Sequence, residues 1–374
     1  MQLSQDPQLS VTRIAPQGNE ARMTAKIAQR KQDHLALCAT GEVGFREKST
    51  LLEEVHFLHN ALPEVDASQL SLDTLLFGQT LRAPIVIAAM TGGTVEAKRV
   101  NLALAGIAEA RGYAFGLGSQ RAMLVSPELK HTFQVRGVAK TTIVLGNIGV
   151  VQARDLPTHV IAELAEAVGA TALCVHLNPA MELVQPDGDR DFRCGADTIE
   201  RLVNELTLPV IVKETGCGLS RHVATVLHGR GVKHVDVSGS GGTSWVGVET
   251  KRAADIGDAE ASALGELFWD WGIPTAASIL QVSSTGFDTV IATGGITNGY
   301  DVARALALGA TAAGFARPVL QAFYENGDAA VHRFFDAVER QLRAILVLTG
   351  TQSPSALKHA PRIIGPHLAA WATG

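Results

Sequence analysis

The stretch TVIATGGITNGYDVARALALGATAAGFAR, residues 289–317, decides the fold. It contains an apolar run (289–293), a Gly-Gly turn, an amphipathic stretch (300–310) with Gly309 near its end, and a second apolar run (311–315). Short runs of Val, Ile and Ala on either side of a helical stretch are typical of two parallel strands joined by a crossover helix. The stretch therefore predicts a β-α-β unit.

The same alternation extends upstream to Pro84 and gives eight strand candidates. They are PIVIAAM (84–90), AFGLG (114–118), TTIVLG (141–146), ALCVH (172–176), PVIVK (209–213), HVDVS (234–238), TVIAT (289–293) and TAAGF (311–315). An α/β fold with eight such units predicts a (β/α)8 TIM barrel. An open doubly wound sheet has the same local pattern and stays an alternative, although no G-x-G-x-x-G motif follows a strand.

The chain reads as one barrel domain over residues 23–374, because 46% hydrophobic residues in 374 suit a single large core. Within it, residues 23–82 precede the first strand and form an N-terminal capping segment. Residues 1–22 are polar and contain two prolines, so we expect a mobile extension. The stretch from Pro318 to about Thr349 predicts a closing helix that is followed by a tail.

Composition limits the partners and the compartment. Lys plus Arg number 32 against 37 Asp plus Glu, and a net charge of −5 offers no basic field for nucleic acid. The four cysteines form no C-x-x-C pair, which favours a reducing compartment. We find no apolar run of membrane-spanning length and no apolar stretch in MQLSQDPQLS. We therefore expect a cytoplasmic protein with no membrane span.

Polar residues and glycines follow most of the predicted strands, where the active sites of barrels lie. Gly294-Gly295 after the seventh strand and Ala316-Arg317 after the eighth match the usual place for a phosphate. Lys213 at the end of the fifth strand points into the mouth in this fold, although a snorkelling surface lysine is the alternative. Two long connections, 177–197 and 239–272, emerge at the same end and are expected to be functional loops.

Three cations and one acidic loop suggest a second anion site. Arg30, Lys31 and Arg121 supply positive charge suited to a diphosphate, although Arg30-Lys31 alone is more typical of a solvated helix end. His176 and Asn178 end the fourth strand, and such a histidine is as often a packed residue as a ligand or an acid. Glu182 is a candidate ligand for Mg²⁺, which prefers few carboxylates together with substrate phosphates.

Taken together, these motifs resemble those of the type 2 isopentenyl-diphosphate isomerases, which are flavin-dependent barrels. The resemblance spans about Arg30 to Leu320. It rests on RKQDH (30–34), HNALPEVD (59–66), MTGG (90–93), GSQR (118–121), GNIGVVQ (146–152), HLNPAMELVQPDGDRDF (176–192), VKETGCG (212–218), DVSGSGGTSW (236–245) and GGITNGYDVARALALGA (294–310).

The resemblance implies FMN in the barrel mouth, with reduction by NADPH, and an isoprenoid diphosphate substrate with Mg²⁺ on Glu182. The implied FMN contacts are Met90, Thr91, Ser119, Asn147, Lys213, Ser238, Thr243, Gly294, Gly295, Ala316 and Arg317. The implied substrate contacts are Arg30, Lys31, Ser119, Arg121, His176 and Met181, and the candidate catalytic residues are His176, Asn178 and Met181. It further implies a homo-oligomer, either a tetramer or an octamer, and the interconversion of isopentenyl and dimethylallyl diphosphate in isoprenoid biosynthesis.

One position departs from the family pattern. Where the family has a glutamine beside the reacting carbons, this chain has Met181, whose thioether carries no proton to donate. The isomerase activity survives if the flavin transfers the protons. If the amide is needed, the chain is a divergent member that acts on another prenyl substrate, or a copy kept for binding alone.

A flavin-dependent 2-hydroxyacid oxidase shares the barrel and the phosphate end and is a remote alternative. Such an enzyme needs a basic histidine and a pair of arginines after the later strands. Residues 238–245, SGSGGTSW, contain no histidine.

Overall fold

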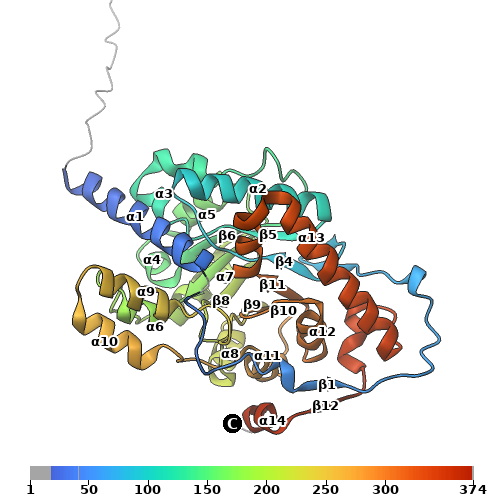
Figure 1. Cartoon of the computed structure of the whole chain (residues 1–374). Helices are drawn as coiled ribbons and strands as arrows, with labels where there is room; N and C mark the ends of the chain where they lie inside the picture. Colours follow the sequence, from blue (N-terminus) through green and yellow to red (C-terminus); the bar gives the residue numbers. More distant parts are fainter. Residues whose placement is uncertain (1–17, 41, 373–374) are drawn as a thin grey trace, which may run out of the picture.

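The computed structural model describes residues 18–40 and 42–372 and contains a closed barrel surrounded by helices (Figure 1). Residues 1–17, which make up most of the expected extension, lie outside the described residues. The expected boundary at residue 22 falls within helix α1, which begins at Gly18. Among the described residues, no helix combines the length and the apolarity that a membrane crossing requires.

All eight predicted barrel strands are present and parallel, and they close in the order β10-β11-β4-β5-β6-β7-β8-β9. Closure through the β11–β4 pair confirms the (β/α)8 barrel and excludes the open sheet. The strands are β4 (Ile85–Ile87), β5 (Ala114–Gly116), β6 (Val144–Gly149), β7 (Ala172–Leu177), β8 (Val210–Glu214), β9 (His234–Asp236), β10 (Thr289–Thr293) and β11 (Ala312–Phe315).

The amino-terminal end of the barrel is closed by a hairpin of β2 (Thr74–Leu76) and β3 (Gln79–Leu81). Leu76 and Leu81 pack onto side chains inside the barrel, and the ring of Phe77 meets His234 edge-on at 5.0 Å. The interior side chains are small or branched, as closure of a narrow barrel requires: Val86, Ala114, Ile143, Leu145, Ala172, Cys174, Ile211, Ile291 and Ala312. Ligands must therefore enter from the opposite, carboxyl end.

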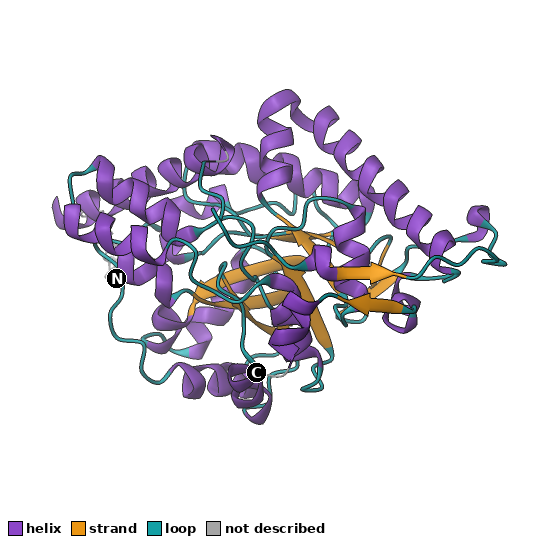
Figure 2. Cartoon of the chain, turned by 60° about the horizontal axis from the view of Figure 1, so that its bottom comes forward, coloured by secondary structure: helices purple, strands orange, loops and turns teal. Residues whose placement is uncertain are grey.

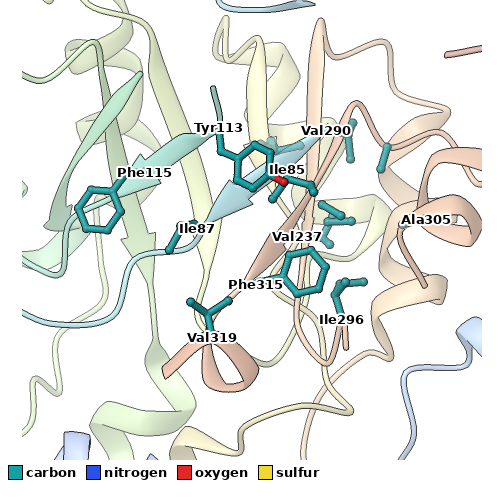
Figure 3. Close-up of a cluster of buried hydrophobic side chains, with 14 of the residues drawn as sticks. Ile85, Ile87, Tyr113, Phe115, Val237, Val290, Ile296, Ala305, Phe315 and Val319 are labelled. Atoms are coloured by element: carbon teal, nitrogen blue, oxygen red, sulfur yellow. The ribbon is translucent and has the colours of Figure 1, made fainter. Parts of the chain in front are cut away.

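The larger core lies between the strands and the surrounding helices (Figure 3). Ile85 and Ile87 of β4 and Phe315 of β11 are fully buried there, and Phe315 meets the ring of Phe335 at 5.8 Å. Each such side chain contributes roughly 1.5–3 kcal/mol when it is fully removed from water. This packing fixes the strands, and with them the positions of the side chains at the strand ends.

The helices surround the strands (Figure 2), and their ends follow local signals. Thr94, Ser220 and Asn298 cap their helices by accepting a backbone N–H bond, as predicted for such residues. Gly112, at φ 67°, ends α2 in the left-handed conformation. The helices that follow the strands are α2 (Val95–Arg111), α3 (Arg121–Val125), α4 (Val150–Arg154), α5 (Thr158–Ala167), α7 (Gly195–Glu205), α8 (Arg221–Gly229), α11 (Thr275–Ser283), α12 (Gly299–Ala307) and α13 (Arg317–Thr349).

The two long connections are not simple loops, because each contains helix. Residues 177–197 include α6 (Pro179–Val184), and residues 239–272 form α9 (Trp245–Asp255) and α10 (Ala259–Phe268). Helix α6 packs against both α9 and α10. The two connections therefore form one helical layer beside the barrel mouth.

The capping segment begins with α1 (Gly18–Thr40), which packs against α3, α9 and α13 beside the mouth (Figure 1). It continues through two 3-10 turns, η1 (Leu52–Glu54) and η2 (Ala67–Gln69), and β1 (Val55–Phe57). Strand β1 pairs antiparallel with β12 (Arg362–Ile364), in the tail after the closing helix. A further turn, η4 (Pro354–His359), and α14 (Pro366–Ala372) complete the described tail.

Candidate active site

A cavity lies at the carboxyl ends of the strands and measures about 1520 Å³ when its open mouth is included. Residues that follow all eight strands line it, and α1 adds a further wall from outside the barrel. The strand ends thus carry polar side chains that the packing of the barrel does not require. Their position at the carboxyl ends of the strands marks the mouth as a candidate active site.

The corner formed by β10, β11 and the start of α13 is built from backbone. Gly294 and Gly295 have φ of 109° and 68°, a region that favours glycine. A Cβ on Gly294 would lie 2.2 Å from the carbonyl oxygen of Gly239. Within the described chain, neither glycine N–H donates a hydrogen bond. These donors and the first turn of α13 form a cradle suited to a phosphate.

Two side chains around this corner have buried polar atoms without partners. Arg317 donates through Nη2 to the carbonyl oxygen of Gly242 at 3.4 Å, whereas its Nη1 has no partner. The hydroxyl of Thr91, which is 2% exposed, also has none. Unpaired buried groups cost free energy, so their presence indicates a ligand that would satisfy them.

Strand register brings a buried lysine and a buried carboxylate together in the mouth. Lys213 of β8 pairs with Asp236 of β9, and their side-chain Nζ and Oδ2 atoms are 3.9 Å apart. Asp236 also accepts a hydrogen bond from the Thr293 hydroxyl at 3.1 Å. Burial raises the pKa of Asp236 above its usual value, against the opposing effect of Lys213. Lys213 therefore brings a cation into the floor of the cavity, below the phosphate cradle.

This arrangement fits FMN on the evidence of the residues themselves. The glycine cradle and Arg317 suit the phosphate, the Thr91 hydroxyl is free to bond a ligand, and Lys213 suits the electron-rich end of a flavin ring. A Cβ on Gly242 would lie 2.4 Å from the nitrogen of Gly295, so larger residues would close the cradle.

The tautomer of His176 follows from its neighbours. Asn147 donates through Nδ2 to the carbonyl oxygen of Leu117 at 3.1 Å, so its Oδ1 faces the Nδ1 of His176 at 2.8 Å. Nδ1 therefore carries the proton, and Nε2 is an acceptor. Burial, reinforced by Lys213, Lys31 and Arg121, lowers the pKa of His176 to about 3. His176 is thus a neutral, oriented acceptor in the cavity.

Three cations meet on the other side of the cavity. Arg30 and Lys31 come from α1, and Arg121 comes from the first residue of α3. Burial, together with the adjacent Arg30 and Arg121 and against the opposing effect of Glu249, lowers the pKa of Lys31 to about 7. An anion in this position would relieve both the desolvation and the repulsion.

Helix α1 is held against α9 by buried ionic contacts. Glu249, with 0% exposure, accepts hydrogen bonds from His34 at 2.7 Å and from Arg252 at 2.5 Å. Arg252 in turn donates to Asp33 at 3.2 Å. Burial lowers the pKa of His34 to about 4, so His34 is neutral and donates its Nε2 proton to the carboxylate. This network fixes the face of α1 that carries Arg30 and Lys31.

Helix α6 places Asn178, Met181 and Glu182 on the cavity wall. Asn178 donates to Glu182 at 2.8 Å and contacts the Met181 sulfur at 3.8 Å. The buried Glu182 carboxylate, 6% exposed, forms no salt bridge with the described cationic side chains. In the described part of the chain, no group of three or more His, Cys, Asp and Glu residues is arranged to bind a metal ion. A single carboxylate suits Mg²⁺ that is shared with substrate phosphates.

All but one of the predicted site residues line this cavity. Thr91 is the exception, because it lies buried beside the lining with its hydroxyl unpaired. Arg30 and Lys31 face the cavity, which excludes the alternative that the pair marks a solvated helix end. Several further lining residues lie in the quoted motifs but were not predicted as site residues, among them His34, Gln152 and Trp245. The only sequence signal that could have identified these residues is their position within the quoted motifs.

Comparison with known proteins agrees with the barrel fold. The sequence profile of the FMN-dependent dehydrogenase family matches residues 23–181 and 176–363. The chain therefore belongs to the FMN-dependent dehydrogenase family. A mandelate oxidase structure superposes with a TM-score of 0.58 at 16% identity, covering 93% of this chain and all of that one. A lactate oxidase of Pediococcus acidilactici gives 0.61 at 14% identity, covering 91% and 94%. At these identities the likeness concerns the fold.

Three relatives show to which group within this family the chain belongs. Isopentenyl-diphosphate delta-isomerase of Methanosarcina barkeri is 42% identical over 343 residues, covering 91% of this chain and 93% of that protein. The enzyme of Methanothermobacter thermautotrophicus is 41% identical over 348 residues, covering 92% and 95%. That of Nostoc sp. is 39% identical over 339 residues, covering 90% and 96%. Within the FMN-dependent barrels, the chain belongs to the type 2 isopentenyl-diphosphate delta-isomerases.

Proposed function

We propose that the protein interconverts isopentenyl and dimethylallyl diphosphate, with reduced FMN and Mg²⁺ in the barrel mouth. The observation that carries this proposal is the presence of two separate anion sites in one cavity. The cradle at Gly294, Gly295 and Arg317 suits the phosphate of a cofactor, and the cationic group on α1 and α3 suits the diphosphate of a substrate.

The cationic group does the substrate binding in this proposal. Arg30 and Arg121 donate charge-assisted hydrogen bonds to the diphosphate, and Lys31 recovers its proton as the anion relieves the local repulsion. Because its Nδ1 faces Asn147, His176 would offer the Nε2 lone pair to a phosphate hydroxyl of the substrate. Glu182 holds the divalent cation that neutralises the remaining charge. The diphosphate anchors the substrate and leaves its carbon chain to the remainder of the cavity.

The reaction is an allylic rearrangement. A proton is added at one end of the C=C–C unit and another is removed at its far end, with no net oxidation. Bound reduced FMN supplies an electron-rich ring that stabilises positive charge and can exchange a proton with the substrate. The protein also limits the access of water to the reacting carbons, and α1 supports this by forming one wall of the cavity.

The direct test is turnover by the FMN-loaded protein. The protein is reduced with dithionite under anaerobic conditions, supplied with Mg²⁺ and isopentenyl diphosphate, and followed by proton NMR in D₂O. We expect dimethylallyl diphosphate with deuterium in its methyl groups. Absence of product with enzyme and substrate at equal concentration contradicts the proposal.

Met181 favours a second candidate, a divergent member that acts on another prenyl diphosphate. Its thioether contacts Asn178 and offers no acidic proton where the family has an amide. Comparison of Met181→Gln with the parent separates the two candidates. A large gain in rate on isopentenyl diphosphate means that the methionine slows an isomerase, whereas an unchanged or lower rate favours a pocket shaped for a different chain.

The remaining features belong to the same proposal. We expect NADPH as the reductant and a homo-oligomer in a cytoplasmic setting. Bleaching of oxidised flavin by simple 2-hydroxyacids would instead favour the oxidase alternative. Bound FMN without turnover of any prenyl diphosphate would favour a binding protein.

A further inference from the structure

The wall of the cavity next to Glu182 contains a side-chain oxygen that no described donor satisfies. Gln185 follows α6, is 2% exposed and lines the cavity. Its Nε2 makes a long contact of 3.4 Å with Oε2 of Glu182, and its Oε1 has no hydrogen-bond partner. An amide oxygen buried without a donor is costly unless a ligand completes it.

The Glu182 carboxylate forms no salt bridge with a described cation, although it interacts electrostatically with Arg30. One of its oxygens accepts a bond from Asn178 at 2.8 Å, and the other accepts the backbone N–H of Asp189 at 2.8 Å. These neutral donors orient the carboxylate without neutralising it. A buried carboxylate without a cation partner is expensive, and a metal ion is one of the few ways to compensate it.

The loop after α6 fixes these two residues in place. Arg190 donates to the carbonyl oxygens of Glu182 and, at 3.0 Å, of Gln185, which satisfies the end of the short helix. A Cβ on Gly188 would lie 2.1 Å from the Glu182 carbonyl oxygen, so only glycine allows the loop to fold back this closely. Asp189 contacts Gln152 at 2.7 Å and Arg121 at 3.8 Å. The loop thus joins the carboxylate to one of the cations of the substrate site.

We propose that the Gln185 side-chain oxygen is part of the divalent cation site, where it binds the ion or one of its waters beside Glu182. Amide and carboxylate oxygens are the ligands that Mg²⁺ and Mn²⁺ take, and Mg²⁺ keeps several waters that need acceptors. Gln185 is therefore a positioning residue for the metal and sets how tightly it is held. The inference rests on the proposed use of a metal but not on the identity of the prenyl substrate.

The test measures metal binding on the FMN-loaded protein. Mn²⁺ with inorganic pyrophosphate is titrated calorimetrically into three proteins: the parent, Gln185→Met and Gln185→Glu. A parallel series with pyrophosphate and EDTA measures the binding of pyrophosphate without the metal ion. Methionine keeps the length of the side chain and removes the acceptor oxygen, whereas glutamate keeps an oxygen and adds charge. The matched control is Leu183→Ala, an exposed residue of the same helix.

We expect the Mn²⁺-pyrophosphate dissociation constant to rise about ten-fold or more in Gln185→Met, the usual cost of losing a residue that supports a metal ligand. Gln185→Glu should bind at least as tightly as the parent, and all variants should match it in EDTA. A change of less than two-fold in Gln185→Met, or an equal loss in EDTA, overturns the inference. If the parent binds as described yet isomerises nothing, the proposed function fails while the metal site stands.

Discussion

The two anion sites of the cavity are built in opposite ways. The cofactor corner at β10 and β11 consists of glycine backbone held by strand pairing. The substrate side consists of long side chains brought from α1, α3 and α6, which lie outside the barrel wall. Backbone is fixed by the fold, whereas side chains on added helices depend on contacts such as Glu249 with His34. Under the proposed function, strand pairing thus sets the cofactor corner, whereas helices packed around the barrel set the substrate side.

The largest effect should come from filling the cofactor corner. In Gly294→Ala, the new Cβ meets the Gly239 carbonyl oxygen and the residue must keep a φ of 109°. Overpacking and backbone strain together cost about 3 kcal/mol or more. We expect the protein to purify without FMN and to melt at a lower temperature, as measured by absorbance and calorimetry. Gly137→Ala, where no atom lies within 4 Å of the new Cβ, is the control and should keep its flavin.

Loss of one cation from the substrate side should leave the cofactor in place. Arg121→Ala removes a charge-assisted contact worth roughly 1.5–3 kcal/mol, which corresponds to a KM increase of about 10- to 100-fold. FMN content and melting temperature should stay close to those of the parent. Arg99→Ala, which breaks an exposed pair with Glu96, should change none of these quantities. If Arg121→Ala lost as much FMN as Gly294→Ala does, the cofactor corner and the substrate side would not be independent.

A smaller effect concerns the proton that Lys31 takes up when an anion binds. The pKa of Lys31 is lowered to about 7 in the free protein, so above pH 7 it is largely neutral and must take up a proton when an anion binds. Affinity for pyrophosphate should therefore fall as the pH rises through 7. At pH 8, calorimetry in buffers of different ionisation enthalpy should show about one more proton taken up by the parent than by Lys31→Arg. The titration of pyrophosphate itself is common to both proteins and cancels, so equal uptake would contradict the assignment.

The smallest effect on function is expected at the closed end of the barrel. Phe77→Ala removes a half-buried ring that meets His234 and should cost about 1–2 kcal/mol of stability. Denaturant unfolding should detect this loss, while KM and FMN affinity stay unchanged, because this end of a barrel contributes stability and not chemistry. A changed KM would mean that packing at the closed end of the barrel affects the geometry of the active site at the other end.

The sequence predicted the cofactor corner better than it predicted the substrate side, for a physical reason. Strand periodicity and Gly-Gly turns are local signals, so all eight strands and the corner at Gly294 and Arg317 could be located. The partners of Arg30 and Lys31 are distant in sequence, and the pair alone suggested a solvated helix end. Glu249 lies on a helix within a stretch expected to be a loop, so its contact with His34 was not predictable.

The role of Gln185 also required the structure. Its motif was visible, but only the coordinates reveal an oxygen without a donor beside a carboxylate without a cation. Burial and unsatisfied hydrogen bonding are properties of the assembled chain, and no local pattern encodes them. From the sequence, Glu182 was already a candidate ligand, and the geometry supports the proposal for its neighbour Gln185.

The pairing of β1 with β12 has a consequence for how the molecule is made. These strands join the segment that carries the substrate cations to the tail beyond the closing helix, across nearly the whole chain. During synthesis the N-terminal partner must wait until the ribosome has released the other, because contacts so distant in sequence form last. A nascent chain stalled within α13 would thus lack this anchor, and the cap gains it only after Ile364 has left the ribosome.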